Sequence, residues 1–227
     1  MTTSPAAFVF DAYGTLFDVH SVAALAERLA PGNGAALSRI WRTKQLEYSW
    51  LQSLMTSGEF VRENFSTLTA HALDYAIAAL VLALAPAERQ RLLDAYGELA
   101  PFPGARDLLA ALAPRPRWIL SNGTRTMLEP LVRSTGLDDV IDGVMSVDDA
   151  GIYKPSPRVY QLAVDRLGLA PAQIAFVSSN GWDAAGAKAF GFTTFWINRD
   201  GLPTERHAPA PDFAIESLAA LAPLVIG

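Results

Sequence analysis

The chain has 227 residues, no cysteine and a formal net charge of −5, and hydrophobic residues make up 51% of it. Its basic residues are scattered singly, so the sequence lacks the basic stripe by which proteins bind nucleic acid. The absence of cysteine excludes disulfides and thiolate metal sites and suits the reducing cytosol, so we expect a cytoplasmic protein.

The first apolar run, residues 6–10, is short and has no polar interruption. Such a run predicts a strand buried on both faces, as in a parallel sheet. It ends at Asp11, and the following Tyr-Gly-Thr indicates a turn. Ligands of open parallel sheets bind at the carboxyl ends of the strands. Asp11 therefore stands where a reactive side chain is expected, unless it only caps the turn.

Residues 17–99 follow helical spacing and predict a helical insert after the first strand. The expected helices span residues 22–29, 36–54, 60–84 (as one or two helices) and 86–99. The longest apolar stretch, residues 76–85, is about half as long as a membrane span. We expect it to form a buried helix, and we expect no membrane association.

After a turn at residues 101–104, helices alternate with strands. The expected strands are residues 117–121, 144–147, 174–178, 193–197 and 213–215, and the expected helices are residues 105–112, 124–134, 157–167 and 184–190. This alternation implies βαβ crossovers. The sequence therefore predicts an α/β fold whose parallel sheet is covered on both faces.

Polar side chains stand at the ends of several predicted strands, and one lysine lies in a loop between two of them. They are Asp11, Ser121, Asn122, Lys154, Ser178, Asn180 and, one turn further on, Asp183. Because the carboxyl ends of parallel strands face one side of a sheet, we expect these groups to meet in one cleft. The start of the helix after Asn122 would favour an anion there. The plainer alternative is that Asp11 and Lys154 form only a structural ion pair.

Four segments resemble, in this order, the four motifs of the haloacid dehalogenase superfamily: Asp-Ala-Tyr-Gly-Thr from Asp11, Leu-Ser-Asn-Gly from Leu120, Tyr-Lys-Pro from Tyr153, and Ser-Ser-Asn-Gly-Trp-Asp from Ser178. Residues 41–48 resemble the cap of the L-2-haloacid dehalogenases. The resemblance extends from about residue 6 to about residue 215. It implies a Rossmann-like core, residues 1–16 and 100–227, with an inserted helical cap domain, residues 17–99.

Most members of this superfamily are magnesium-dependent phosphatases, which place a second Asp two residues after the nucleophile and carboxylates after the fourth strand. This chain has Tyr13 at the first position, and a tyrosine of ordinary pKa near 10 is a poor acid at neutral pH. After the fourth strand, where the phosphatases place carboxylates, it has Ser178, Ser179 and Asn180. Halide leaves without a proton, so both departures favour cleavage of a carbon–halogen bond. We expect hydrolysis of L-2-haloacids to D-2-hydroxyacids with no metal and no cofactor; a phosphatase of the superfamily or a non-catalytic binding protein on the same fold are the alternatives.

The resemblance implies that Asp11 attacks C2 of the haloacid and forms an ester, which water then hydrolyses. Lys154 and Thr15 would orient Asp11, and Asp183 would anchor Lys154 or position the hydrolytic water. Arg42, from the cap, would receive the departing halide.

The remaining family positions concern substrate contacts and support. Ser121 and Asn122 would hold the substrate carboxylate. Ser178 and Asn180 also match catalytic positions, and the other implied substrate contacts are Tyr13, Leu46, Tyr160 and Trp182, with Phe60 as a further apolar wall. Each has a plainer alternative as a packed or solvated side chain. The implied partners are a small 2-haloalkanoic acid, its halide product and a second copy of the chain in a homodimer.

Overall fold

The computed structural model describes residues 4–206 and 208–226. The outermost residues of the predicted core segments, 1–3 and 227, lie outside this range. The described chain contains one sheet of six parallel strands, in the order β3-β2-β1-β4-β5-β6. The strands are β1 (Ala7–Phe10), β2 (Arg117–Ser121), β3 (Gly143–Ser146), β4 (Ile174–Ser178), β5 (Thr193–Ile197) and β6 (Phe213–Ile215). The predicted α/β fold with a parallel sheet is confirmed.

Strand β1 lies between β2 and β4, and all four of its residues are buried. Phe8 and Phe10 belong to the hydrophobic core on one face of the sheet, and Val9 belongs to the core on the other. This two-residue alternation explains why the strand is apolar throughout. Asp11 therefore leaves the sheet near its middle.

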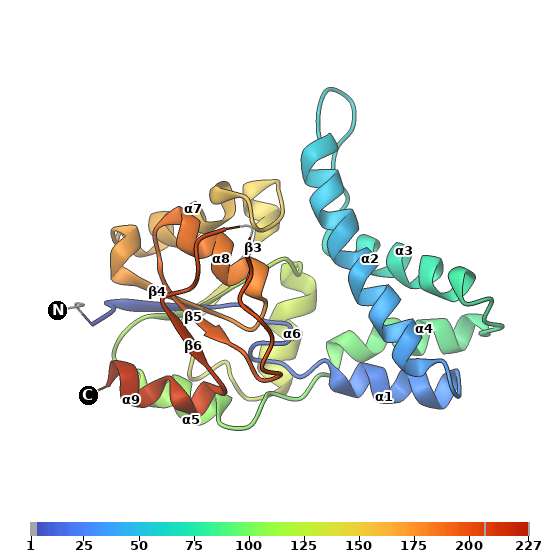
Figure 1. Cartoon of the computed structure of the whole chain (residues 1–227), viewed down its shortest axis with the longest axis horizontal. Coiled ribbons are helices and arrows are strands. Elements are labelled where there is room, and N and C mark those ends of the chain that lie inside the picture. The colour runs from blue at the N-terminus through green and yellow to red at the C-terminus, as the bar shows by residue number, and fades with distance from the viewer. Residues whose placement is uncertain (1–3, 207, 227) are drawn as a thin grey trace.

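Helices cover both faces of the sheet (Figure 1). Helices α5 (Ala105–Ala111), α6 (Arg125–Ser134) and α9 (Ala222–Val225) contribute to the core around Phe8, and α7 (Pro157–Leu167) and α8 (Gly181–Phe190) to the core around Val9. Short 3₁₀ segments occur at Ala95–Gly97, Val147–Ala150, Pro171–Gln173 and Leu218–Ala220. Helix α8 begins three residues before the predicted Ala184, and α9 was not predicted.

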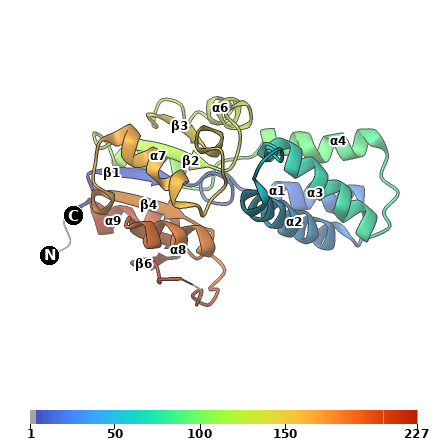
Figure 2. The same cartoon turned by 90° about the horizontal axis from the view of Figure 1, so that it is seen from above.

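The insert consists of α1 (His20–Leu29), α2 (Gly34–Met55), α3 (Phe65–Ala79) and α4 (Pro86–Asp94), which lie together to one side of the sheet (Figures 1 and 2). The predicted helix 60–84 is a single, shorter helix. It begins at Phe65 because the side chain of Asn64 caps it, accepting a hydrogen bond from the Thr67 N–H. The predicted boundaries of this cap, 17–99, stay a prediction.

The two connections between the insert and the sheet run side by side. Phe17 and Pro101 form an antiparallel bridge. The N–H of Asp18 donates to the carbonyl of Ala100 at 2.8 Å, and that of Phe102 donates to Leu16 at 2.8 Å. The first connection thus begins a few residues after Asp11, and the second lies hydrogen-bonded beside it.

The two ends of the described chain meet at the opposite end of the sheet (Figures 1 and 2). Nη1 of Arg115 donates to the carbonyl of Val225 at 2.9 Å and to Oγ of Ser4 at 3.3 Å. Within residues 4–206 and 208–226, no helix combines the length and the hydrophobicity needed to cross a bilayer.

Candidate active site

Asp11 is held at the end of β1 by three side-chain donors. Its Oδ1 accepts from Nζ of Lys154 at 3.1 Å, and its Oδ2 accepts from Oγ1 of Thr15 at 2.9 Å and Nδ2 of Asn180 at 3.0 Å. Asp11 is 6% exposed, so these bonds operate where water competes little. The carboxylate is fixed in one orientation at the edge where the strands end.

Lys154 bridges two buried carboxylates. Its Nζ lies 3.1 Å from Oδ1 of Asp11 and 2.9 Å from Oδ2 of Asp183. Burial alone would lower the pKa of Lys154, but the two carboxylates outweigh burial and raise that pKa. Its backbone N–H donates to Oδ1 of Asn122 at 3.1 Å, which ties the lysine loop to the end of β2.

Asp183, in the first turn of α8, is fully buried and accepts hydrogen bonds on both oxygens. Besides Lys154, Oδ2 accepts from Oγ of Ser178 at 3.0 Å, and Oδ1 accepts from the hydroxyl of Tyr160 at 2.8 Å. Burial raises the pKa of Asp183, with Lys154 opposing and Asp11 adding to the rise. This geometry supports the anchoring alternative for Asp183.

Tyr160 is a buried neighbour of Asp183. Its ring packs among Phe176, Phe190 and Phe192, and its fully buried hydroxyl donates to Oδ1 of Asp183. In this structure Tyr160 supports Asp183, and its predicted substrate contact stays a prediction.

A small cavity lies in front of Asp11, with about 10 Å³ of water-accessible volume, room for about one water molecule. It is lined by Asp11, Tyr13, Arg42, Leu46, Phe65, Ser121, Asn122, Lys154, Asn180 and Trp182. The predicted wall Phe60 is 42% exposed in the loop after α2, and Phe65, at the start of α3, takes its place. With this volume the cavity, as it stands, is smaller than a haloacid molecule.

Arg42 enters this cavity from α2. Its Nη2 donates to Oδ1 of Asn180 at 3.3 Å, so one amide links the guanidinium to Asp11. Its Nη1 donates to Oε1 of Gln45 at 2.6 Å. Gln45 is fully buried, and its Nε2 donates to Oγ1 of Thr69 in α3 at 2.7 Å. Sequence reasoning missed Gln45, and its only signal was a polar residue on the apolar face of a helix.

The segment after β2 offers a small polar pocket beside Asp11. Oγ of Ser121 accepts from the N–H of Gly123 at 3.1 Å, and the side chain of Thr124 caps α6. A Cβ on Gly123 would lie 2.9 Å from the ring of Tyr13, so only glycine allows this close approach. Ser121 and Asn122 line the cavity with the N-terminus of α6 behind them, an arrangement that favours an anion.

Tyr13 stands where a phosphatase would have its acid. Burial raises the pKa of Tyr13, and Tyr96 and Asp11 add to the rise. A phenol with such a pKa is an even weaker acid than an exposed tyrosine. Among the described residues, no three histidine, aspartate or glutamate side chains are grouped so as to hold a metal ion.

Arg199, which sequence reasoning did not single out, holds the turn that follows Asp11. Its Nη1 donates to the carbonyl of Gly14 at 2.7 Å and its Nη2 to that of Thr15 at 3.0 Å. Its guanidinium also lies 3.6 Å from the ring centre of Phe102. This one side chain thus joins the nucleophile turn to the second connection of the insert.

Comparison with known proteins agrees with this geometry. A family model described as haloacid dehalogenase-like hydrolase matches residues 5–191. The chain is 46% identical to an (S)-2-haloacid dehalogenase of Pseudomonas sp. (strain YL), over 95% of this chain and 92% of that protein. It superimposes on the crystal structure of the L-2-haloacid dehalogenase RSc1362 with a TM-score of 0.95 and 47% identity, covering 99% and 100% of the two chains.

A second solved structure, of L-2-haloacid dehalogenase from Xanthobacter autotrophicus, has chloropropionic acid covalently bound. It is 41% identical to this chain, with a TM-score of 0.89, and the match covers 98% of this chain and 99% of that one.

Proposed function

The chain belongs to the haloacid dehalogenase-like hydrolases, and we propose that within this family it hydrolyses L-2-haloacids to D-2-hydroxyacids. One observation carries the proposal. Asp11, oriented by Lys154, Thr15 and Asn180, faces the same cavity as Arg42. A nucleophile and a cation for the leaving group therefore flank the space that a substrate carbon would occupy.

In the first step a carboxylate oxygen of Asp11 attacks C2 of the haloacid. The carbon–oxygen bond of an ester forms as the carbon–halogen bond breaks, and the bonding electrons leave with the halide. Negative charge grows on the halogen in the transition state, and the guanidinium of Arg42 stabilises it. Ser121, Asn122 and the N-terminus of α6 hold the substrate carboxylate.

In the second step water attacks the carbonyl carbon of the Asp11 ester. The ester's acyl bond breaks, the hydroxyacid leaves with its C2–oxygen bond intact, and Asp11 regains its carboxylate with one oxygen from water. The balance is haloacid plus water to hydroxyacid, halide and a proton. Lys154 and Asp183 keep Asp11 in place through both steps, and Tyr13, Leu46, Phe65 and Trp182 enclose the alkyl group.

We propose that no metal takes part, because the groups that would hold one in a phosphatase are replaced. Tyr13 occupies the position of the second acid. Ser178 donates a hydrogen bond to Asp183, and Asn180 donates one to Asp11. The test is halide release from L-2-chloropropionate with and without EDTA. We expect equal rates, whereas strict Mg²⁺ dependence, or turnover of a phosphate monoester at a comparable rate, would favour the phosphatase alternative.

We propose a homodimer as the functional assembly. Support comes from large apolar side chains exposed at the end of α2 and in the loop after it: Leu51, Leu54, Met55, Phe60 and Val61. A patch of this kind is typical of a surface that a partner covers. Light scattering during size-exclusion chromatography tests this, and a monomeric mass at all concentrations would contradict it. The cytoplasmic location stays a prediction.

A further inference from the structure

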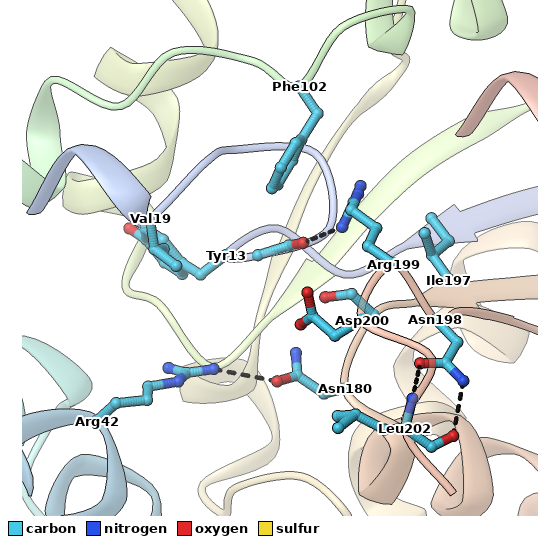
Figure 3. Close-up of a pocket in the computed structure, with 12 residues that line it drawn as sticks. Tyr13, Val19, Arg42, Phe102, Asn180, Ile197, Asn198, Arg199, Asp200 and Leu202 are labelled. Atoms are coloured by element: carbon cyan, nitrogen blue, oxygen red, sulfur yellow. Dashed lines mark hydrogen bonds between the residues drawn. The ribbon is translucent and has the colours of Figure 1, made fainter. Parts of the chain in front are cut away.

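A second cavity, of about 200 Å³, adjoins the one at Asp11. The two cavities share Tyr13, Arg42 and Asn180 in their linings. In Figure 3 the guanidinium of Arg42 points to Asn180 from one side of this second cavity, and Arg199 lies on the other side. The hydrogen bond between Arg42 and Asn180 therefore lies at the boundary between the small cavity at Asp11 and the larger second cavity.

Two guanidinium groups line the second cavity without an ion-pair partner. Neither Arg42 nor Arg199 takes part in an ion pair within 4 Å among the described residues. Arg42 donates to the neutral amides of Gln45 and Asn180, and Arg199 donates to two backbone carbonyls. The cations are thus oriented by neutral groups and keep their charge for a further ligand.

Among the described residues, two carboxylates, those of Asp18 and Asp200, affect the charge of Arg199 without forming an ion pair with it within 4 Å. Burial lowers the pKa of Arg199, and the carboxylates of Asp18 and of Asp200, which lines the cavity, only partly oppose this. Asn198, which also lines the cavity, has its side-chain amide engaged with the backbone of Leu202. The lining therefore favours a small anion, and Asp200 moderates how tightly it is held.

We propose that this second cavity is a halide-release site, which takes the anion from Arg42 after displacement and holds it between Arg42 and Arg199 before it leaves. The proposal rests on the proposed dehalogenase function. A halide that stayed beside Arg42 would remain placed to attack C2 of the ester and reverse the first step. Transfer past Asn180 into the second cavity removes it from that position.

Variants at the rim of the second cavity test this without touching the catalytic groups. Asp200→Asn removes the carboxylate, and Leu202→Glu adds one at a side chain that is 58% exposed. Glu59→Gln is the matched control, because it makes the same charge change as Asp200→Asn at an exposed position in the loop after α2. Glu59→Gln is expected to keep the halide-free initial rate of the unaltered protein.

The experiment locates bromide by anomalous diffraction at several concentrations and measures bromide inhibition of L-2-chloropropionate turnover in solution. We expect one bromide at Arg42 and another between Arg42 and Arg199. Inhibition should be about threefold tighter in Asp200→Asn and about threefold weaker in Leu202→Glu, as for a unit charge acting through solvent across several ångströms. Glu59→Gln should match the unaltered protein.

Bromide found only at Arg42, bromide in the second cavity only at crystal concentrations, or equal inhibition in all variants would each overturn the release site. These results would leave the proposed function intact, provided that the unaltered protein releases halide. A protein that releases no halide from any 2-haloacid would overturn the proposed function instead.

Discussion

Oε1 of Gln45 accepts a hydrogen bond of 2.6 Å from Nη1 of Arg42, one turn earlier in α2. Gln45 is fully buried, and its own amide is fixed to Thr69. A neutral acceptor therefore sets the direction of the guanidinium without neutralising it. This suits a cation that must meet a charge developing on a leaving halogen.

Gln45→Glu is expected to slow halide displacement by roughly tenfold or more, because the new carboxylate would draw the charge of Arg42 away from the halogen. Halide release in a single turnover measures it. Thr69→Val is the matched control, since it removes the other partner of Gln45 and leaves the contact with Arg42. If Gln45→Glu slows the Arg42→Ala variant just as much, Gln45 acts on the fold and not through Arg42.

Arg42→Ala is expected to lower the rate of halide release by roughly 10²–10³, the usual effect of losing one donor that stabilises a developing charge. The unfolding temperature should change little, because Arg42 is only partly buried and forms no ion pair within 4 Å with the described residues. Arg42→Lys separates charge from geometry and should recover part of the rate. Activity within about threefold of the unaltered protein would contradict the assignment.

Oxygen labelling distinguishes the covalent route from direct attack by water. In H₂¹⁸O, a single turnover with excess enzyme should place the label in Asp11, which mass spectrometry of the peptide detects. Chiral analysis of the product should show that an L-haloacid gives a D-hydroxyacid, because C2 is attacked once, from behind. Label in the hydroxyacid after one turnover would instead make Asp11 a general base.

Lys154→Met should abolish activity and make stability depend on pH. In the unaltered protein the raised pKa of Lys154 means that its contribution to stability is complete below its unfolded pKa, near 10.4, and is lost as pH rises through the folded value. Without the ammonium, Asp183 stays fully buried beside Asp11 with no counter-ion, and its folded pKa rises further. The variant therefore keeps its free energy of unfolding below about pH 4. As the pH rises to neutral, it loses about 3–5 kcal/mol of that free energy.

Thermal unfolding at pH 4.5 and pH 7.5 measures this, and the deficit of the variant should be larger at the higher pH. Lys188→Met is the control, because Lys188 pairs with Asp212 at 2.6 Å while 34% of its side chain is exposed. We expect it to lose at most about 1 kcal/mol at either pH. Equal losses at both pH values in Lys154→Met would contradict the coupling between the two carboxylates.

The sheet was predictable because its central strands are largely buried and apolar. The alternation of short apolar segments with helices predicted β2, β4, β5 and β6 at the bounds that the structure shows. The meeting of Asp11 with Lys154 and Asp183 followed from the shared edge of parallel strands, although these residues are far apart in sequence.

Details that depend on how the insert rests on the sheet were not predictable. Phe65 replaces Phe60 because Asn64 starts α3 four residues after Phe60, and helical spacing alone does not fix that start. Gln45 affects the site only by orienting Arg42, and Arg199 by its hydrogen bonds to the turn after Asp11. Tyr160 donates its hydroxyl to Asp183 and does not line the cavity at Asp11.

The meeting of both chain ends at Arg115 has a practical consequence. The two ends of the described chain, which Arg115 joins through Ser4 and Val225, lie at the end of the sheet away from the insert (Figure 1). If the protein were attached to a solid support through either end, the side that carries the insert and the Asp11 cavity would face the solution. The same closeness lets a short linker join the ends, so that new ends can be opened in an exposed loop with the sheet order kept.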